Sequence, residues 1–168
     1  MFVFFLSLMC MSSKKRTDKA TALLKLQRYC AYQDRCHKEV RTKLINLGVY
    51  GLDLENVITE LIADNFLNEE RYACSYARGK FRMKGWGRVR IRQELKFRKI
   101  SDYCIKKAMK EIEEDDYMAT LKEILIKKER LSREKDSFKR RGGLANFAIR
   151  RGFESNLVWL VVKEILPD

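Results

Sequence analysis

Apolar residues recur along this 168-residue chain with the spacing of helix faces. Three pairs, each separated by four positions, mark a similar helix at three places in the sequence. The pairs are Val40 with Leu44, Ile91 with Leu95, and Leu144 with Ala148. Residues four apart share one side of an α-helix, so each pair predicts a buried stripe. The pairs fall into register when Val49, Ile100 and Phe153 are aligned, which gives offsets of 51 and 53 residues.

A second amphipathic pattern follows each of these helices. Its spacing of i, i+3 and i+4 is again helical. The equivalent positions are Ile58, Ile105 and Val158, then Leu61, Ala108 and Val161, then Ile62, Met109 and Val162. The alignment requires a short insertion, residues 50–53, in the first copy. A further helix is predicted before each copy, over residues 20–31, 69–83 and 116–130, with Asn68 as a candidate N-cap and Ser101 as another further along.

We therefore expect an all-α protein of three tandem three-helix repeats that form an elongated, curved molecule. Repeat 1 comprises residues 17–67, repeat 2 residues 68–114 and repeat 3 residues 115–168, after a tail of residues 1–16. A unit of about 50 residues buries little apolar surface alone, so neighbouring repeats should stack.

The segment 85–95, GWGRVRIRQEL, has two readings. Its alternation of arginine with Val and Ile is typical of an edge strand. A strand needs partners, and no second alternating segment is present. We therefore predict a helix from about Arg88, preceded by a turn at Gly85 and Gly87. Trp86 either packs over this turn or stays exposed as a contact residue, and packing is the preferred interpretation.

The composition supports a helical fold and shows that the chain is strongly basic. The sole proline is Pro167, and Lys, Glu, Leu and Arg are abundant. The formal net charge is +13, which favours a polyanion, an anionic membrane or an acidic protein as partner. Between Arg71 and Lys99 there are eleven Lys and Arg against one acid, Glu94. Nucleic acid or a nucleoprotein is the preferred partner.

Catalytic and metal chemistry find little support. Cys30, Cys36 and His37 are close together, but their spacing matches no zinc motif, and His37 is the sole histidine. The adjacent acids Asp115 and Asp116 would point about 100° apart on a helix, so they make a poor catalytic pair. We expect no enzyme activity, no cofactor and no metal, with the cysteines as reduced, buried thiols.

The amino-terminal segment MFVFFLSLMC is nearly all apolar. Its roughly ten apolar residues are too few to span a bilayer, which needs about 20. We interpret residues 1–16 as an over-extended start, with translation beginning at Met9 or Met11. A short, unusual export signal is the alternative.

The basic residues of the middle repeat are predicted to form one surface across two helices. One stripe contains Arg71, Arg78 and Arg82, and the other contains Arg88, Arg92 and Lys96. These cations lack acids four residues away, so we expect them to be uncompensated. The candidate contact residues are Arg71, Arg78, Lys80, Arg82, Lys84, Arg88, Arg90, Arg92, Lys96 and a second cluster, Lys139, Arg140 and Arg141. A solvated helix face is the alternative interpretation.

The middle repeat resembles the central motif of the RecX family. The resemblance rests on an acidic pair, Arg, an aromatic residue and Ala, followed by Lys, Gly, Arg, Ile, Glu-Leu and Ile. In this chain the residues are Asn68, Glu69, Glu70, Arg71, Tyr72, Ala73, Ser75, Lys80, Gly85, Arg88, Ile91, Glu94, Leu95 and Ile100. Arg150, Arg151, Gly152 and Phe153 resemble the family's motif in the third repeat. One departure is Lys99, where the family has Gly.

The resemblance implies a small cytoplasmic regulator of the RecA recombinase. Such a protein binds in the helical groove of RecA filaments on DNA and most often inhibits strand exchange and ATP hydrolysis. It also implies contact roles for Arg71, Lys80 and Arg88. We expect a monomer that binds RecA filaments and DNA without sequence preference and has no membrane partner. The alternatives are a general nucleic-acid-binding helical protein without a RecA partner, a hydrolase, and a purely structural scaffold.

Overall fold

The computed structural model of the chain describes residues 17–167. These residues form nine α-helices and no strand, which confirms the all-α prediction. The helices are α1 (Lys19–Tyr32), α2 (His37–Asn46), α3 (Gly51–Ala63), α4 (Glu69–Lys84), α5 (Arg88–Phe97), α6 (Asp102–Met109), α7 (Glu114–Arg130), α8 (Ser137–Arg150) and α9 (Ser155–Ile165). The interpretations made for residues 1–16 lie outside the described residues.

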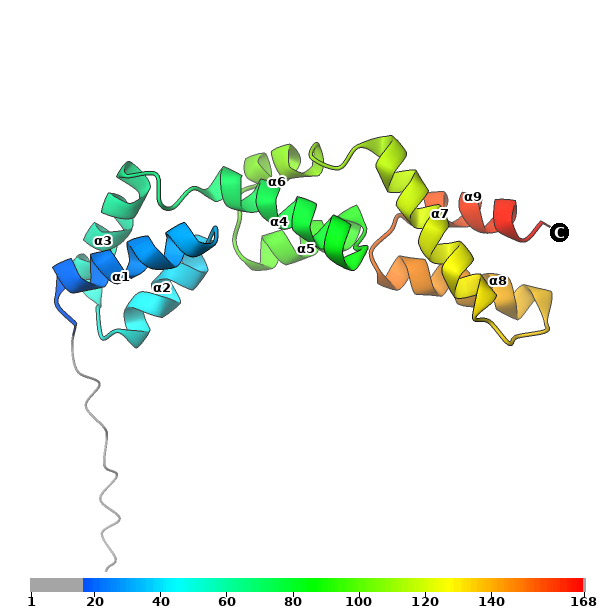
Figure 1. The fold of residues 1–168 in the computed structure, drawn as a ribbon, viewed down its shortest axis with the longest axis horizontal. Helices are drawn as coiled ribbons and strands as arrows, with labels where there is room; N and C mark the ends of the chain where they lie inside the picture. The colour runs from blue at the N-terminus through cyan, green and yellow to red at the C-terminus, as the bar shows by residue number, and fades with distance from the viewer. Residues whose placement is uncertain (1–16, 168) are drawn as a thin grey trace, which may run out of the picture.

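The helices form three groups of three that follow one another along an elongated arc (Figure 1). Helices α1–α3 lie at one end, α4–α6 in the middle and α7–α9 at the other end. The second helix of each group, α2, α5 or α8, lies toward the lower edge in this view, and that edge is concave. The predicted elongated, curved arrangement of tandem three-helix repeats is therefore confirmed.

Local capping explains where several helices begin. The side chain of Asn68 accepts a hydrogen bond from the backbone N–H of Arg71, and Ser101 does the same for Cys104. Such caps satisfy backbone donors that have no partner inside the helix. Both N-caps were predicted from the sequence. Asp18 and Asp136 cap α1 and α8 in the same way.

The segment 85–95 is helical from Arg88, as predicted. Gly85 ends α4 in the left-handed conformation, with φ of 58°, which suits glycine. Gly87 has an ordinary extended backbone, with φ of −76°. Its lack of a side chain matters for another reason, because it lies directly against the backbone of repeat 3.

The predicted helix faces are largely the buried ones. All six residues of the three defining pairs, Val40 to Ala148, are buried. The third position of the following helices was predicted less well, since Ile62 is 46% exposed whereas Val162 is buried. On α1 the buried face consists of Ala22, Leu26 and Cys30, whereas Leu24 is exposed.

The interior is divided into two apolar clusters. One lies within repeat 1 and includes Leu26, Leu44 and Leu61. The other runs without interruption through repeats 2 and 3, from Tyr72 to Val162. Repeats 2 and 3 therefore share one core, whereas repeat 1 has its own.

Lys99 occupies a position that glycine holds in the other repeats. Its φ is 60°, and the equivalent Gly48 and Gly152 also have positive φ, of 76° and 91°. A left-handed lysine costs on the order of 1 kcal/mol relative to glycine. The fold tolerates this strain at the end of α5 and does not reshape the turn.

Candidate polyanion interface

Several arginines predicted to be uncompensated are paired with carboxylates from distant parts of the chain. Arg71 pairs with Asp34 at 2.8 Å, Arg78 with Glu111 at 2.9 Å and Arg88 with Glu114 at 2.7 Å. Two other members of the candidate list are paired as well, Lys96 with Asp102 and Arg140 with Glu129. The prediction of uncompensated charge is wrong for these residues, because their partners lie on other helices or loops.

Arg71 connects repeat 2 to repeat 1. Its Nε donates to Asp34, and its Nη2 donates to the backbone carbonyl oxygens of Asn65 and Phe66, at 3.0 and 3.3 Å. Ser75 Oγ donates to the second oxygen of the same Asp34 carboxylate at 2.8 Å. Arg71 is thus positioned by the junction of two repeats.

Arg88 lies at the opposite end of repeat 2, against repeat 3. Its guanidinium donates to the carbonyl oxygen of Ile112 at 2.9 Å and to Glu114, and stacks 4.2 Å from the ring centre of Tyr117. Its side chain is only 17% exposed. Because Arg71 and Arg88 belong to different junctions, they do not form the single surface that helix periodicity predicted.

Other cations of repeat 2 are held by aromatic rings. Arg90 lies 4.0 Å from the ring centre of Trp86, and Lys80 lies 5.1 Å from the ring centres of both Trp86 and Tyr76. Arg98 lies 4.8 Å from the ring centre of Tyr76, and also pairs with Glu94. We call the series Arg90, Trp86, Lys80, Tyr76 and Arg98 the cation–ring ladder. A ring attracts a cation without neutralising it, so Arg90 and Lys80 are positioned and still charged.

Trp86 packs, as the preferred interpretation of the sequence expected. It is half-buried against the core of repeats 2 and 3, and both Lys80 and Arg90 lie close to its ring. Nothing in the spacing of GWGR indicated that two cations would contact one ring, because Lys80 belongs to the preceding helix.

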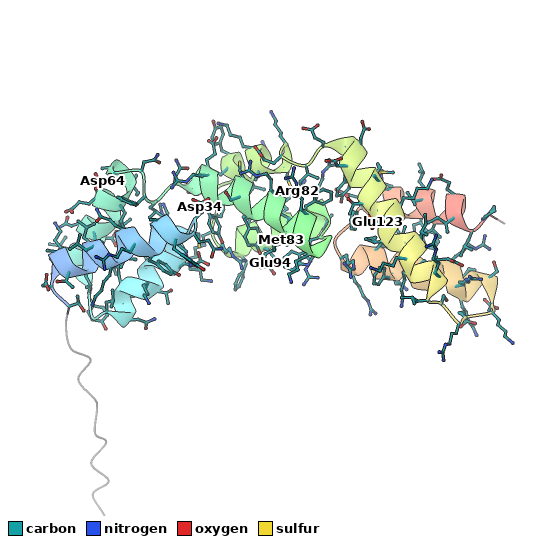
Figure 2. All side chains as sticks on the ribbon, viewed as in Figure 1. Asp34, Asp64, Arg82, Met83, Glu94 and Glu123 are labelled. Carbon is teal, nitrogen blue, oxygen red and sulfur yellow. The ribbon has the colours of Figure 1, made fainter. Side chains whose placement is uncertain are left out.

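Repeat 2 also carries exposed cations outside the ladder. Arg82 and Lys84 near the end of α4 and Arg92 on α5 are exposed, and none has an ion pair among the described residues. Figure 2 shows Arg82 and Met83 on α4, and Met83 is 81% exposed. In the second predicted cluster, Lys139 is exposed at the start of α8, close in sequence to the paired Arg140 and to Arg141. That cluster lies in repeat 3, apart from the ladder.

The charge is segregated by the position of a helix within its repeat. The second helices, α2, α5 and α8, together contain eleven Lys and Arg and two acids. The third helices, α3, α6 and α9, contain three Lys and Arg and five acids. Since the second helices lie toward the concave edge in Figure 1, we call this side the basic edge.

A cleft of about 370 Å³ lies beside the ladder, between repeat 1 and α4. Tyr72, Tyr76, Lys80, Lys84 and Arg98 contribute to its wall from repeat 2. Its acids are already engaged, since Asp34 binds Arg71 and Glu39 accepts a hydrogen bond from the backbone N–H of Cys36. The lining is therefore aromatic and positively charged, which suits an anionic or aromatic group.

The described residues contain no group of three or more His, Cys, Asp or Glu side chains placed to hold a metal ion. The four cysteines among them are unpaired, and burial raises the pKa of the Cys30, Cys36 and Cys74 thiols. None of the helices between residues 17 and 167 is long and apolar enough to cross a bilayer.

The sequence of the chain is similar to those of RecX proteins. Residues 68–109 match the family model described as RecX, second three-helix domain. The chain is 27% identical over 148 residues to the regulatory protein RecX of Bacillus cytotoxicus and 26% identical to that of Bacillus mycoides. Each alignment covers 88% of this chain and 54% of the relative, so the chain spans about half the length of these curated relatives.

Solved structures share the fold. The crystal structure of RecX from Lactobacillus salivarius matches with a TM-score of 0.77 and 21% identity, covering 88% of this chain and 96% of that one. A second crystal structure of a regulatory protein RecX matches with a TM-score of 0.76 and 22% identity, over 88% of this chain and 72% of the other.

Proposed function

The comparisons support the RecX family for this chain, and from that premise we propose that it regulates a RecA recombinase by binding RecA–DNA filaments. Binding would use the basic edge and the cation–ring ladder. Occupying the filament groove there would lower DNA-dependent ATP hydrolysis and strand exchange. The protein would act as a non-covalent modulator and would bind DNA without sequence preference.

The observation that carries this proposal is the set of cations that are positioned yet not neutralised. Arg90 and Lys80 are fixed by rings, and Arg92 is exposed with no ion pair among the described residues. Lost side-chain entropy weakens a contact, so a pre-positioned cation binds a phosphate or carboxylate better than a mobile one. Phosphate contacts of this kind make affinity fall steeply as salt rises.

The ion pairs of the fold divide the contact residues expected from the sequence into two groups. Lys80, Arg82, Lys84, Arg90 and Arg92 remain proposed contacts with the filament. Arg71 and Arg88 are assigned instead to the two junctions between repeats, and Arg78 to an ion pair within repeat 2, because their charges are already paired within the chain. Lys96 has only an exposed pair at 3.5 Å, so it stays available to a partner.

The test is a titration of the cognate RecA's DNA-dependent ATPase with the protein at two salt concentrations. We expect inhibition at low salt that weakens at high salt. The double variant Lys80→Gln with Arg90→Gln should require about tenfold more protein for the same inhibition, as expected when two phosphate contacts are lost.

The matched control is Lys106→Gln with Lys163→Gln, which removes the same charge from exposed positions on the third helices α6 and α9. It should inhibit like the unmodified protein. Equal losses in both double variants would mean that net charge alone matters. No effect of the unmodified protein on RecA, combined with tight binding to naked DNA, would favour a general nucleic-acid-binding protein instead.

A further inference from the structure

The junction between repeats 2 and 3 is held by backbone contacts. The N–H of Gly87 donates to the carbonyl oxygen of Arg151 at 2.8 Å, and the N–H of Val89 donates to that of Gly152 at 3.0 Å. A Cβ atom on Gly87 would overlap the backbone of Gly152, and one on Gly152 would overlap Arg90. Two backbones this close cannot slide past each other without breaking hydrogen bonds.

The side chain of Tyr117 reinforces the same junction. Its ring is fully buried between Phe81 and Phe153, with ring centres 5.8 and 4.9 Å away. Its hydroxyl accepts from the N–H of Arg88 and donates to Glu154. Because the apolar core also continues across this junction, repeats 2 and 3 form a single packed body.

The junction between repeats 1 and 2 is built differently. Among the described residues, no backbone-to-backbone hydrogen bond connects residues 17–63 with residues 69–112. Cys36 is the one buried side chain of repeat 1 that joins the core of repeats 2 and 3. Other contacts are polar or exposed and include Asp34 with Arg71 and Ser75, and Lys38 against the ring of Phe97. Arg71 also donates to the carbonyl oxygens of Asn65 and Phe66, which immediately precede repeat 2.

Open space accompanies this sparse packing. Four clefts of about 280 to 410 Å³ are lined by residues of both repeats. They border both ends of the contact, from Cys30 and Arg71 to Thr42 and Lys99. A junction with little buried apolar surface and adjacent voids can rotate at low cost in free energy.

We propose that the molecule bends at the junction of repeats 1 and 2, with the Asp34 carboxylate as the latch that fixes the angle, while repeats 2 and 3 move as one body. Figure 2 shows Asp34 where α1 approaches α4. Both of its oxygens are used, one by Arg71 and one by Ser75, so a single carboxylate joins the turn after α1 to two successive turns of α4. Releasing it would let α2 swing relative to α5 and change the curvature of the basic edge.

The latch can be tested without any partner. Spin labels attached to a keto amino acid avoid the native cysteines, and the exposed positions Leu52, Tyr103 and Leu160 place one label in each repeat. Distances are measured by double electron–electron resonance for Leu52–Tyr103 and for Tyr103–Leu160. We expect the distribution across repeats 1 and 2 to be the broader one, and Asp34→Asn to widen it about twofold while leaving the other unchanged.

The matched control is Asp64→Asn, which removes the same charge from an exposed residue of repeat 1 and should widen neither distribution. Ser75→Ala removes one of the two latch bonds and should widen the first distribution by less than Asp34→Asn does. If Asp34→Asn fails to fold, Ser75→Ala still tests the latch. Equal widths for the two pairs in the unmodified protein would overturn the single bending point. Unchanged widths in both latch variants would overturn the role of Asp34. Neither outcome depends on RecA, so the regulatory proposal is tested separately.

Discussion

Gly87 and Gly152 lie backbone to backbone, although 65 positions separate them in the sequence. A side chain on Gly87 would overlap the backbone of Gly152, and a side chain on Gly152 would overlap Arg90, so both positions require glycine. Gly152 also needs its positive φ, whereas Gly87 does not. Glycine is therefore required at position 87 by the packing of two repeats alone, and at position 152 by both packing and backbone conformation.

Replacing Gly87 by alanine should destabilise the protein by about 2 kcal/mol or more, because the new methyl group would overlap a backbone that cannot move aside. Urea unfolding followed by circular dichroism measures this loss. Gly142→Ala is the control, since it lies within α8 with open space around it. It should stabilise the protein by about 0.5–1 kcal/mol, and a similar loss in both variants would contradict the packing argument.

Arg88→Ala should destabilise the protein by about 2 kcal/mol, because a largely buried guanidinium donates to Ile112 and Glu114. Arg92→Ala, one helical turn away and exposed, should change the free energy of unfolding by less than about 0.5 kcal/mol. Chemical denaturation of the two variants makes the comparison. Indistinguishable stabilities would return Arg88 to the list of surface contacts.

Lys99→Gly should stabilise the protein by about 1 kcal/mol, since it removes a left-handed lysine. The same substitution at Lys96, inside α5, should instead cost about 1 kcal/mol through lost helix propensity. The opposite signs distinguish relief of backbone strain from a general effect of losing a lysine. Thermal unfolding of both variants gives the signs directly.

Asp34 gives the stability a specific dependence on acid. Its burial raises the pKa, but the hydrogen bonds from Arg71 and Ser75 outweigh burial and hold the pKa below the ordinary value of 3.8. A depressed folded-state pKa stabilises the protein above the unfolded value, and the gain is lost as pH falls through the folded value. The difference in unfolding free energy between the unmodified protein and Asp34→Asn should therefore be constant near neutral pH and shrink below about pH 4. A difference that does not change with pH would show that the carboxylate charge is not what stabilises the junction.

Helix periodicity was enough to predict most of the fold. Ile91 and Leu95 had to share a buried face if 85–95 was helical, and both are buried. Asn68 and Ser101 were recognisable as N-caps because capping depends on the next few residues alone. Ile62 was mispredicted because the three repeats do not have the same neighbours. The matching Val162 lies in the core shared by repeats 2 and 3, whereas Ile62 lies on an outer face.

The candidate surface was predicted less well, for a physical reason. Periodicity reports which residues share a helix face, but not which distant side chain faces them. Asp34 lies 37 residues before Arg71, and Glu114 lies 26 residues after Arg88. Searching only for acids four residues away therefore missed both partners. The ring contacts of Lys80 and Arg90 were missed similarly, because they depend on how the turn at Gly85 brings Trp86 close to Lys80 of the preceding helix.

The separate core of repeat 1 has a consequence for spectroscopy. Both tryptophans of the chain, Trp86 and Trp159, belong to the shared body of repeats 2 and 3. Fluorescence excited selectively at tryptophan therefore does not report on the amino-terminal third of the fold, whereas the far-ultraviolet circular dichroism of the backbone amides reports on all of it. In one denaturation experiment, tryptophan fluorescence and circular dichroism would then give different unfolding curves. The difference between their midpoints would measure how independently repeat 1 unfolds.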